Sequence, residues 1–160
     1  MTDQENILAV LEKIAHSFNT AGIHWAVGAS MLLYFRGITD VFHDIDLMMD
    51  VKDTAKLETI LTALGAVKMP IPPSSIFKNK YFAKWELQGT GIDVMAGMII
   101  VCHGEEKNCS FNEKDVDGSA QLGKETIPLY SVPQWRYFYD LMGRENKVRM
   151  IDRANSEIHD

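Results

Sequence analysis

Apolar and polar positions recur along the chain with two different periods, and the changes of period divide it into helices and strands. Between Thr2 and Gly22 apolar residues fall three or four positions apart, which predicts an amphipathic helix. Thr2 and Glu5 have the spacing of a capping box, and Gly22 is typical of a helix end. Four more helices are expected, over residues 31–37, 53–64, 134–142 and 145–157.

Shorter apolar stretches between these helices predict strands. His24–Val27 is a short apolar strand, and Asp44–Leu47 alternates between polar and apolar residues. Ile76–Leu87 and Ile92–Val101 are separated by a glycine-rich turn and are expected to pair as a hairpin. Residues 104–128 are polar and rich in turn residues, which predicts a surface loop with short strands. The alternation of helices and strands indicates an α/β chain without internal repeats.

Three aspartates lie in the predicted strands. Asp44 and Asp46 are two positions apart, so both carboxylates point to one face while Ile45 and Leu47 point to the other. At a separation of roughly 6 to 7 Å, two carboxylates repel by about 2 to 3 kcal/mol when the effective dielectric constant is near 20. Asp93 lies in an apolar run typical of a strand, and a third anion raises this cost unless a cation relieves it. Such carboxylates are suited to hold two Mg²⁺ ions against a nucleoside triphosphate.

A simpler interpretation of the same stretch is a solvated sheet edge that carries acids, since Met48 and Asp50 continue the face of the first two aspartates. The segment upstream favours the functional interpretation. There, Gly28, Ala29 and Ser30 follow an apolar strand and precede a helix. Backbone N–H groups at such a turn can form a phosphate-binding site, and the Ser30 hydroxyl can donate a hydrogen bond to a phosphate oxygen.

These segments resemble the nucleotidyltransferase superfamily that includes DNA polymerase beta, and especially its small bacterial members. The shared pattern is an apolar residue and Gly, then Gly or Ser, a spacer, Asp-apolar-Asp-apolar, and a third acid on a later strand. Val27–Ser30, Asp44–Leu47 and Ile92–Val94 are similar to it, with Ala29 where Gly or Ser is usual. The segment Tyr34–Asp40 also resembles the Arg-bearing link of toxin-type and antibiotic-modifying members.

The resemblance implies a nucleotidyltransferase fold, with a mixed central β-sheet flanked by helices. It implies magnesium-dependent transfer of AMP or another nucleoside monophosphate from a triphosphate to a hydroxyl of a small molecule or protein, with release of pyrophosphate. The catalytic and metal-binding residues that it implies are Asp44, Asp46 and Asp93. The nucleotide-binding residues that it implies are Gly28, Ala29, Ser30 and Arg36.

The resemblance implies a separate role in the reaction for each of these residues. Asp44 and Asp46 bridge two Mg²⁺ ions, and Asp93 completes the shell of the ion nearer the acceptor hydroxyl. Asp93 is also the candidate general base for that hydroxyl. Arg36 is expected to help neutralise the charge that develops on the departing pyrophosphate.

Length and charge narrow the choice of partners. A chain of 160 residues is expected to form one domain, residues 1–160, which leaves no room for a separate nucleic-acid-binding module. The net charge of −6 disfavours binding to a nucleic-acid backbone. The longest apolar run, Val94–Cys102, has nine residues and is too short to span a bilayer, so we expect a cytoplasmic protein. Cys102 and Cys109 are expected to be reduced thiols, because their spacing fits no strong zinc pattern.

Two other functions remain open at this stage. The chain could keep the fold as a catalytically weak partner-binding or regulatory module, for example in a toxin–antitoxin pair, or it could be a metal-dependent hydrolase built on the same acids. The aromatic residues of 135–139 are more typical of a core than of base stacking. The basic segment 143–149 resembles, loosely, the C-terminal helix of toxin-type relatives, and no role is assigned to it.

Overall fold

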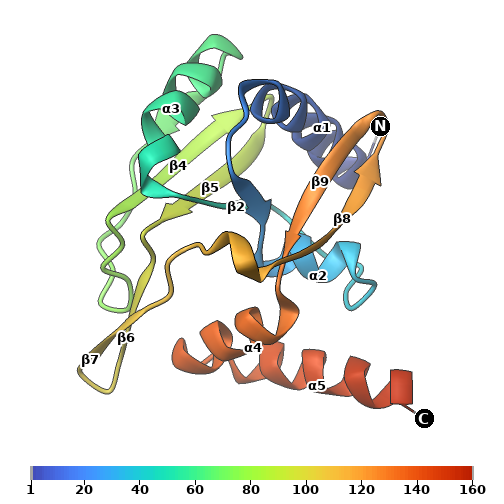
Figure 1. Cartoon of the computed structure of the whole chain (residues 1–160), viewed down its shortest axis with the longest axis vertical. Helices are drawn as coiled ribbons and strands as arrows, with labels where there is room; N and C mark the ends of the chain where they lie inside the picture. The colour runs from blue at the N-terminus through green and yellow to red at the C-terminus, as the bar shows by residue number, and fades with distance from the viewer. Residues whose placement is uncertain (1, 160) are drawn as a thin grey trace.

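The computed structural model describes residues 2–159 and combines five α-helices, nine strands and two 3₁₀ turns (Figure 1). The helices are α1 (Asp3–Ala21), α2 (Ala29–Phe35), α3 (Thr54–Ala63), α4 (Val132–Leu141) and α5 (Glu145–His159). The strands are β1 (Trp25–Val27), β2 (Ile45–Met49), β3 (Val67–Met69), β4 (Tyr81–Leu87), β5 (Thr90–Ala96), β6 (Ile99–Cys102), β7 (Glu105–Asn108), β8 (Val116–Leu122) and β9 (Glu125–Tyr130). The 3₁₀ turns are η1 (Val51–Asp53) and η2 (Glu113–Asp115).

Seven of the strands form one mixed sheet in the order β3-β4-β5-β2-β1-β9-β8. The central pairs β2–β5 and β1–β9 are parallel, whereas β1 and β2 are antiparallel. α1 and α3 lie together at one end of the molecule in Figure 1, and α4 and α5 lie at the other. The expected class, a mixed central sheet flanked by helices, is therefore confirmed.

The first helix begins and ends where its sequence predicts. The Thr2 hydroxyl accepts a hydrogen bond from the backbone N–H of Glu5 at 3.1 Å, and the Glu5 carboxylate accepts one from the N–H of Thr2. Gly22 ends the helix with φ of +70°, a left-handed conformation that glycine adopts at little cost. The apolar face of α1 is buried and joins the main core.

The expected hairpin is correct in its centre and wrong at both ends. β4 and β5 pair antiparallel from Tyr81–Ala96 to Leu87–Thr90, but residues 76–80 form no strand and contribute only an isolated bridge between Phe77 and Ile100. The second strand stops at Ala96 because Gly97 turns the chain with φ of +59°. Residues 99–102 then leave the main sheet and pair with β7.

The polar segment 104–128 is more ordered than its composition predicts. Its second half forms β8 and joins β9, which pairs with β1 and so extends the central sheet. In β8 most side chains are exposed or partly exposed, which explains why no apolar alternation is visible in its sequence. The predicted combination of loop and short strands agrees with the structure, although the sequence did not indicate that β8 joins the main sheet.

The C-terminal helices complete the core. α4 begins two residues earlier than predicted, because the Ser131 hydroxyl accepts a hydrogen bond from the N–H of Gln134 at 3.2 Å and Pro133 occupies the first turn. Trp135 and Phe138 are 2% exposed and belong to the core, as expected, while Tyr137 is exposed. None of the helices in residues 2–159 has both the length and the apolar character needed to cross a bilayer.

Candidate active site

Two of the three predicted catalytic carboxylates face each other across neighbouring strands. β2 and β5 are parallel, and their register pairs Asp46 with Asp93. On either side of this pair, Ile45 with Ile92 and Leu47 with Val94 are fully buried in the core. Since side chains alternate along a strand and register partners share a face, Asp46 and Asp93 project together from the opposite face of the sheet. The predicted alternation of Asp46 with Ile45 and Leu47 therefore agrees with the structure.

The third carboxylate, Asp44, precedes β2 and reaches the same region. A Cβ atom built on Gly91 would lie 2.5 Å from Asp44 Oδ1, so the carboxylate rests directly against the backbone of β5, two residues before Asp93. Gly91 lies in the glycine-rich turn that the sequence predicts between the two strands. In the structure it is a strand residue, and its missing side chain leaves room for Asp44.

Burial and nearby charges make Asp46 and Asp93 more basic than ordinary aspartates. Asp46 retains only partial exposure, and burial, followed by the nearby charges of Asp93 and Asp44, raises its pKa well above the ordinary value of 3.8. Burial also raises the pKa of Asp93, with a smaller contribution from Asp44 and an opposing one from Lys84. The three carboxylates are thus close enough to act on one another electrostatically.

Two lysines partly balance this negative charge. Lys84 on β4 is the register partner of Asp93, and its Nζ lies 3.8 Å from Asp93 Oδ1. Lys147 on α5 donates a hydrogen bond from Nζ to Ser30 Oγ at 3.1 Å, and its charge lowers the pKa of Asp46. Neither lysine was predicted. The hairpin register would have revealed Lys84, whereas the contact between Lys147 and Ser30 joins segments far apart in the chain, and no local pattern signals it.

The predicted phosphate-binding turn is fixed directly to the strand that carries the acids. The backbone N–H of Gly28 donates to the carbonyl oxygen of Asp46 at 3.0 Å. Ala29 has φ of +50°, a left-handed conformation that is uncommon for a residue with a Cβ atom. The following helix, α2, has only seven residues and is short of the expected end at Gly37. The groups available to bind a phosphate here are therefore the Gly28–Ser30 turn and Lys147, rather than the dipole of a long helix.

An aromatic ring fills the space that a side chain at position 28 would occupy. A Cβ atom at this position would lie 2.6 Å from Cε2, Cζ2 and Nε1 of Trp135. Trp135 is buried, and its Nε1 has no hydrogen-bond partner. The turn thus rests on the core through a direct contact between Gly28 and the indole ring.

Arg36, the remaining predicted nucleotide ligand, contacts β8. Its guanidinium group donates to the backbone carbonyl of Asp117 and lies 3.9 Å from that residue's carboxylate. A role for Arg36 in nucleotide binding stays a prediction, and in the structure its observed role is to tie the end of α2 to β8.

The carboxylates have the chemistry to bind a divalent cation, but their side chains do not converge on a single metal position. In the described part of the chain, no group of three or more Asp, Glu, His or Cys side chains is close enough to hold a metal ion. Asp93 Oδ1 is nevertheless buried without a hydrogen-bond partner, and Asp46 lies opposite it. Carboxylate oxygens are the ligands that Mg²⁺ prefers, so the donor chemistry of these residues fits the ion.

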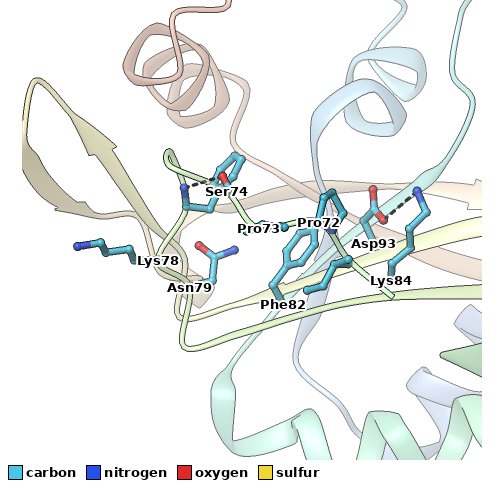
Figure 2. Close-up of a pocket in the computed structure, with 10 residues that line it drawn as sticks. Pro72, Pro73, Ser74, Lys78, Asn79, Phe82, Lys84 and Asp93 are labelled. Carbon is cyan, nitrogen blue, oxygen red and sulfur yellow. Dashed lines mark hydrogen bonds and ion pairs between the residues drawn. The ribbon is translucent and has the colours of Figure 1, made fainter. Parts of the chain in front are cut away.

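A cavity of about 680 Å³, here called the Asp93 pocket, opens next to the carboxylates (Figure 2). Asp93 and Lys84 lie at one end of it, and Asn79 lies at the other. Between them the wall consists mainly of Phe82 and the loop that contains Pro72 and Pro73. The volume is in the range of pockets that bind small molecules.

A match to a known family establishes the family to which the chain belongs. The model of the aminoglycoside-2''-adenylyltransferase family matches residues 10–156. The chain belongs to this family. The expected resemblance to antibiotic nucleotidyltransferases is therefore confirmed.

Solved structures share the fold at low sequence identity. A candidate nucleotidyltransferase from Thermotoga maritima has a TM-score of 0.74 and 18% identity, covering 98% of this chain and 96% of its own. The antibiotic-resistance factor ANT(2'')-Ia, in complex with adenylyl-2''-tobramycin, has a TM-score of 0.63 and 14% identity over 92% of this chain and 88% of its own. The lincosamide antibiotic adenylyltransferase LnuA, bound to lincomycin, has a TM-score of 0.59 and 13% identity, covering 89% of this chain and 94% of its own. A search of the curated proteins found no match.

Proposed function

We propose that the protein transfers a nucleoside monophosphate from a nucleoside triphosphate to a hydroxyl group of a small molecule and releases pyrophosphate. The observation that carries this proposal is the direct connection between the two halves of the site. Asp46 faces Asp93 across the central strands, and the carbonyl of Asp46 also accepts the hydrogen bond from Gly28. The carboxylates and the candidate phosphate-binding turn are therefore joined directly to each other.

The phosphate end of the site has its own donors. Backbone N–H groups of the Gly28–Ser30 turn, the Ser30 hydroxyl and the Lys147 ammonium group are the candidates to bind the triphosphate. Lys147 and Ser30 already contact each other at 3.1 Å, so both groups are positioned before a ligand arrives. Asp44, Asp46 and Asp93 would hold Mg²⁺, which when bound supplies positive charge that stabilises the phosphates and makes the acceptor hydroxyl more acidic.

Asp93 is the candidate to accept the proton of the acceptor hydroxyl. It borders the Asp93 pocket, its Oδ1 has no hydrogen-bond partner, and burial raises its pKa, which makes it a better base than an exposed aspartate. The Lys84 ammonium group forms an ion pair with this carboxylate at 3.8 Å. The deprotonated hydroxyl then attacks the α-phosphorus, and the bond to the pyrophosphate oxygen breaks.

Family membership and the structural neighbours favour an adenylyl donor and an antibiotic-type acceptor. The test is pyrophosphate release from ATP and Mg²⁺ in the presence of tobramycin, lincomycin or other small hydroxyl compounds, with mass spectrometry to detect the adenylylated product. Asp46→Asn and Asp93→Asn are expected to abolish transfer, and Asp140→Asn, an exposed acid on α4, serves as the matched control. Transfer at the normal rate by Asp46→Asn would refute the proposal.

The alternative of a partner-binding module predicts a different binding result. A calorimetric titration with ATP and millimolar Mg²⁺ separates the two, because the transferase must bind the nucleotide even when its acceptor is unknown. Absence of ATP binding in the intact protein would favour the module.

A further inference from the structure

The Asp93 pocket contains chemical information about the acceptor, and the part farthest from Asp93 is the most specific. The Asn79 side chain oxygen accepts a hydrogen bond from the backbone N–H of Ile99 at 3.0 Å. This contact fixes which end of the amide is oxygen and which is nitrogen. The nitrogen, Nδ2, is buried and has no acceptor. In Figure 2 it is on the side of the amide that faces Phe82.

A buried donor without an acceptor is uncommon, because desolvation of an N–H group is not compensated until an oxygen reaches it. Asn79 lines the Asp93 pocket, so a bound molecule is the available source of that oxygen. A carboxylate or carbonyl group would satisfy the donor, whereas an ammonium group would leave it unpaired and add a repulsive charge.

The middle of the pocket is apolar and open. Phe82 and Ile71 are 36% and 42% exposed, although both are large apolar side chains that are usually buried. Pro72 and Pro73 lie beside Phe82 in Figure 2 and complete a wall of flat, rigid surfaces. Such a wall favours a ligand with a flat apolar body and loses little conformational entropy when the ligand binds.

The charges of the pocket disfavour a polyamine. Two lysines, Lys78 and Lys84, and one acid, Asp93, line it. Lys84 already neutralises Asp93, and the other carboxylates of the site, Asp44 and Asp46, are candidates to bind Mg²⁺. A polycation in this position would meet the Lys84 ammonium group and gain no free carboxylate within the pocket.

We propose that the Asp93 pocket binds the acceptor, and that this acceptor is an alcohol with a flat apolar body and a carboxylate or carbonyl oxygen at its far end, not a polyamine. The inference rests on the proposed transferase function and makes it more specific. The hydroxyl lies at Asp93, the apolar body lies along Phe82 and the prolines, and the oxygen accepts from Asn79 Nδ2. The family's name refers to aminoglycosides, which carry several amines, so this chain would differ from that class in its acceptor.

Binding of a matched pair of probes to the full chain tests the proposal without depending on catalysis. The probes are 4'-(hydroxymethyl)biphenyl-4-carboxylate and its 4-aminomethyl analogue, which share the apolar body and the hydroxyl and differ in the group at the far end. Isothermal titration calorimetry is expected to give a dissociation constant about tenfold lower or better for the carboxylate, the usual effect of one hydrogen bond to a charged group. Tobramycin is expected to bind more weakly than either. Equal or tighter binding of the amine or tobramycin, or no binding of the carboxylate, would overturn the proposal.

Asn79→Asp reverses the decisive group while preserving the fold. Its carboxylate can still accept from the N–H of Ile99, but it replaces the unpaired donor by an anion. The preference is expected to reverse, so that the amine probe binds more tightly than the carboxylate probe. Asn108→Asp is the matched control, because the Asn108 oxygen also accepts a backbone N–H, from Ser110 at 3.0 Å, and lies outside the Asp93 pocket. An unchanged preference in Asn79→Asp would contradict the proposal.

The outcome is separable from that of the proposed function. If some hydroxyl compound is adenylylated but the probes bind with the wrong preference, the acceptor class is wrong and the transferase function stands. If the probes bind as expected but no compound is adenylylated in the presence of ATP and Mg²⁺, the pocket assignment stands and the transferase function fails.

Discussion

Substitution of Gly28 by alanine tests whether the phosphate-binding turn is shaped by the core beneath it. The backbone of Gly28 has φ of −130° and ψ of −168°, which any residue can adopt, so alanine introduces no backbone strain. The added Cβ atom, however, would lie 2.6 Å from three atoms of the Trp135 indole ring. The ring cannot move freely, because Phe138 and Tyr139 contact it with ring centroids 5.3 Å away in both cases.

The expected cost is that of an overpacked core. Insertion of one methyl group into a close-packed site costs about 1 to 3 kcal/mol. In a domain of this size that corresponds to a fall in Tm of about 2 to 12 °C. Trp135→Phe removes part of the ring and a buried N–H without a partner, so it makes room for the methyl group. The double variant should therefore be more stable than the sum of the single effects by about 1 kcal/mol or more.

Urea unfolding of the wild type, both single variants and the double variant measures this coupling. Gly28→Ala with Trp85→Phe is the matched control, because Trp85 is equally buried but is not among the atoms near Gly28. That pair should be additive. If Gly28→Ala with Trp135→Phe were additive within about 0.5 kcal/mol, the contact with the indole ring would not explain the glycine.

Three further predictions concern the site itself. Asp46→Asn should raise Tm at pH 7 without Mg²⁺, because the folded-state pKa of Asp46 is raised and its ionisation destabilises the fold. The gain in Tm should grow as pH rises above the ordinary pKa of 3.8 and vanish below that pH. Thermal unfolding of both proteins at a series of pH values measures this gain. Gly91→Ala should displace the Asp44 carboxylate and lower kcat for transfer by about 10- to 100-fold with little change in Tm, which steady-state kinetics and calorimetry measure together. Lys147→Met should raise the KM for ATP by about tenfold or more, while Lys124→Met, at an exposed position, should leave it unchanged.

Local signals in the sequence were sufficient for the elements that position the acids. Strand alternation assigned Asp46 to the face opposite Ile45 and Leu47, and the buried Ile45 and Leu47 confirm it. The capping box at Thr2 likewise depends only on neighbours in the chain. Both features depend on near residues, so periodicity and cap chemistry determine them.

Features that depend on distant segments could not be derived in the same way. Gly91 was assigned to a turn because glycine is common in turns, but its role depends on the position of Asp44, forty-seven residues earlier. Lys147 appeared only as one of several basic residues near the end of the chain, and its contact with Ser30 requires α5 to cross the start of α2. The early end of β5 is an intermediate case, because Gly97 was visible in the sequence but its positive φ was not.

The site lowers the stability of the protein in a way that the proposed function explains. Burial and two neighbouring carboxylates oppose the ionisation of Asp46, and Lys84 and Lys147 are the cations that favour it. Each lysine comes from a different element, β4 or α5, and each also faces a place where a substrate group is expected. Lys84 borders the Asp93 pocket, and Lys147 contacts the turn proposed to bind phosphates. A metal–nucleotide complex would bring positive charge to the carboxylates and negative charge to Lys147 at the same time, so binding would relieve the imbalance that folding leaves in place.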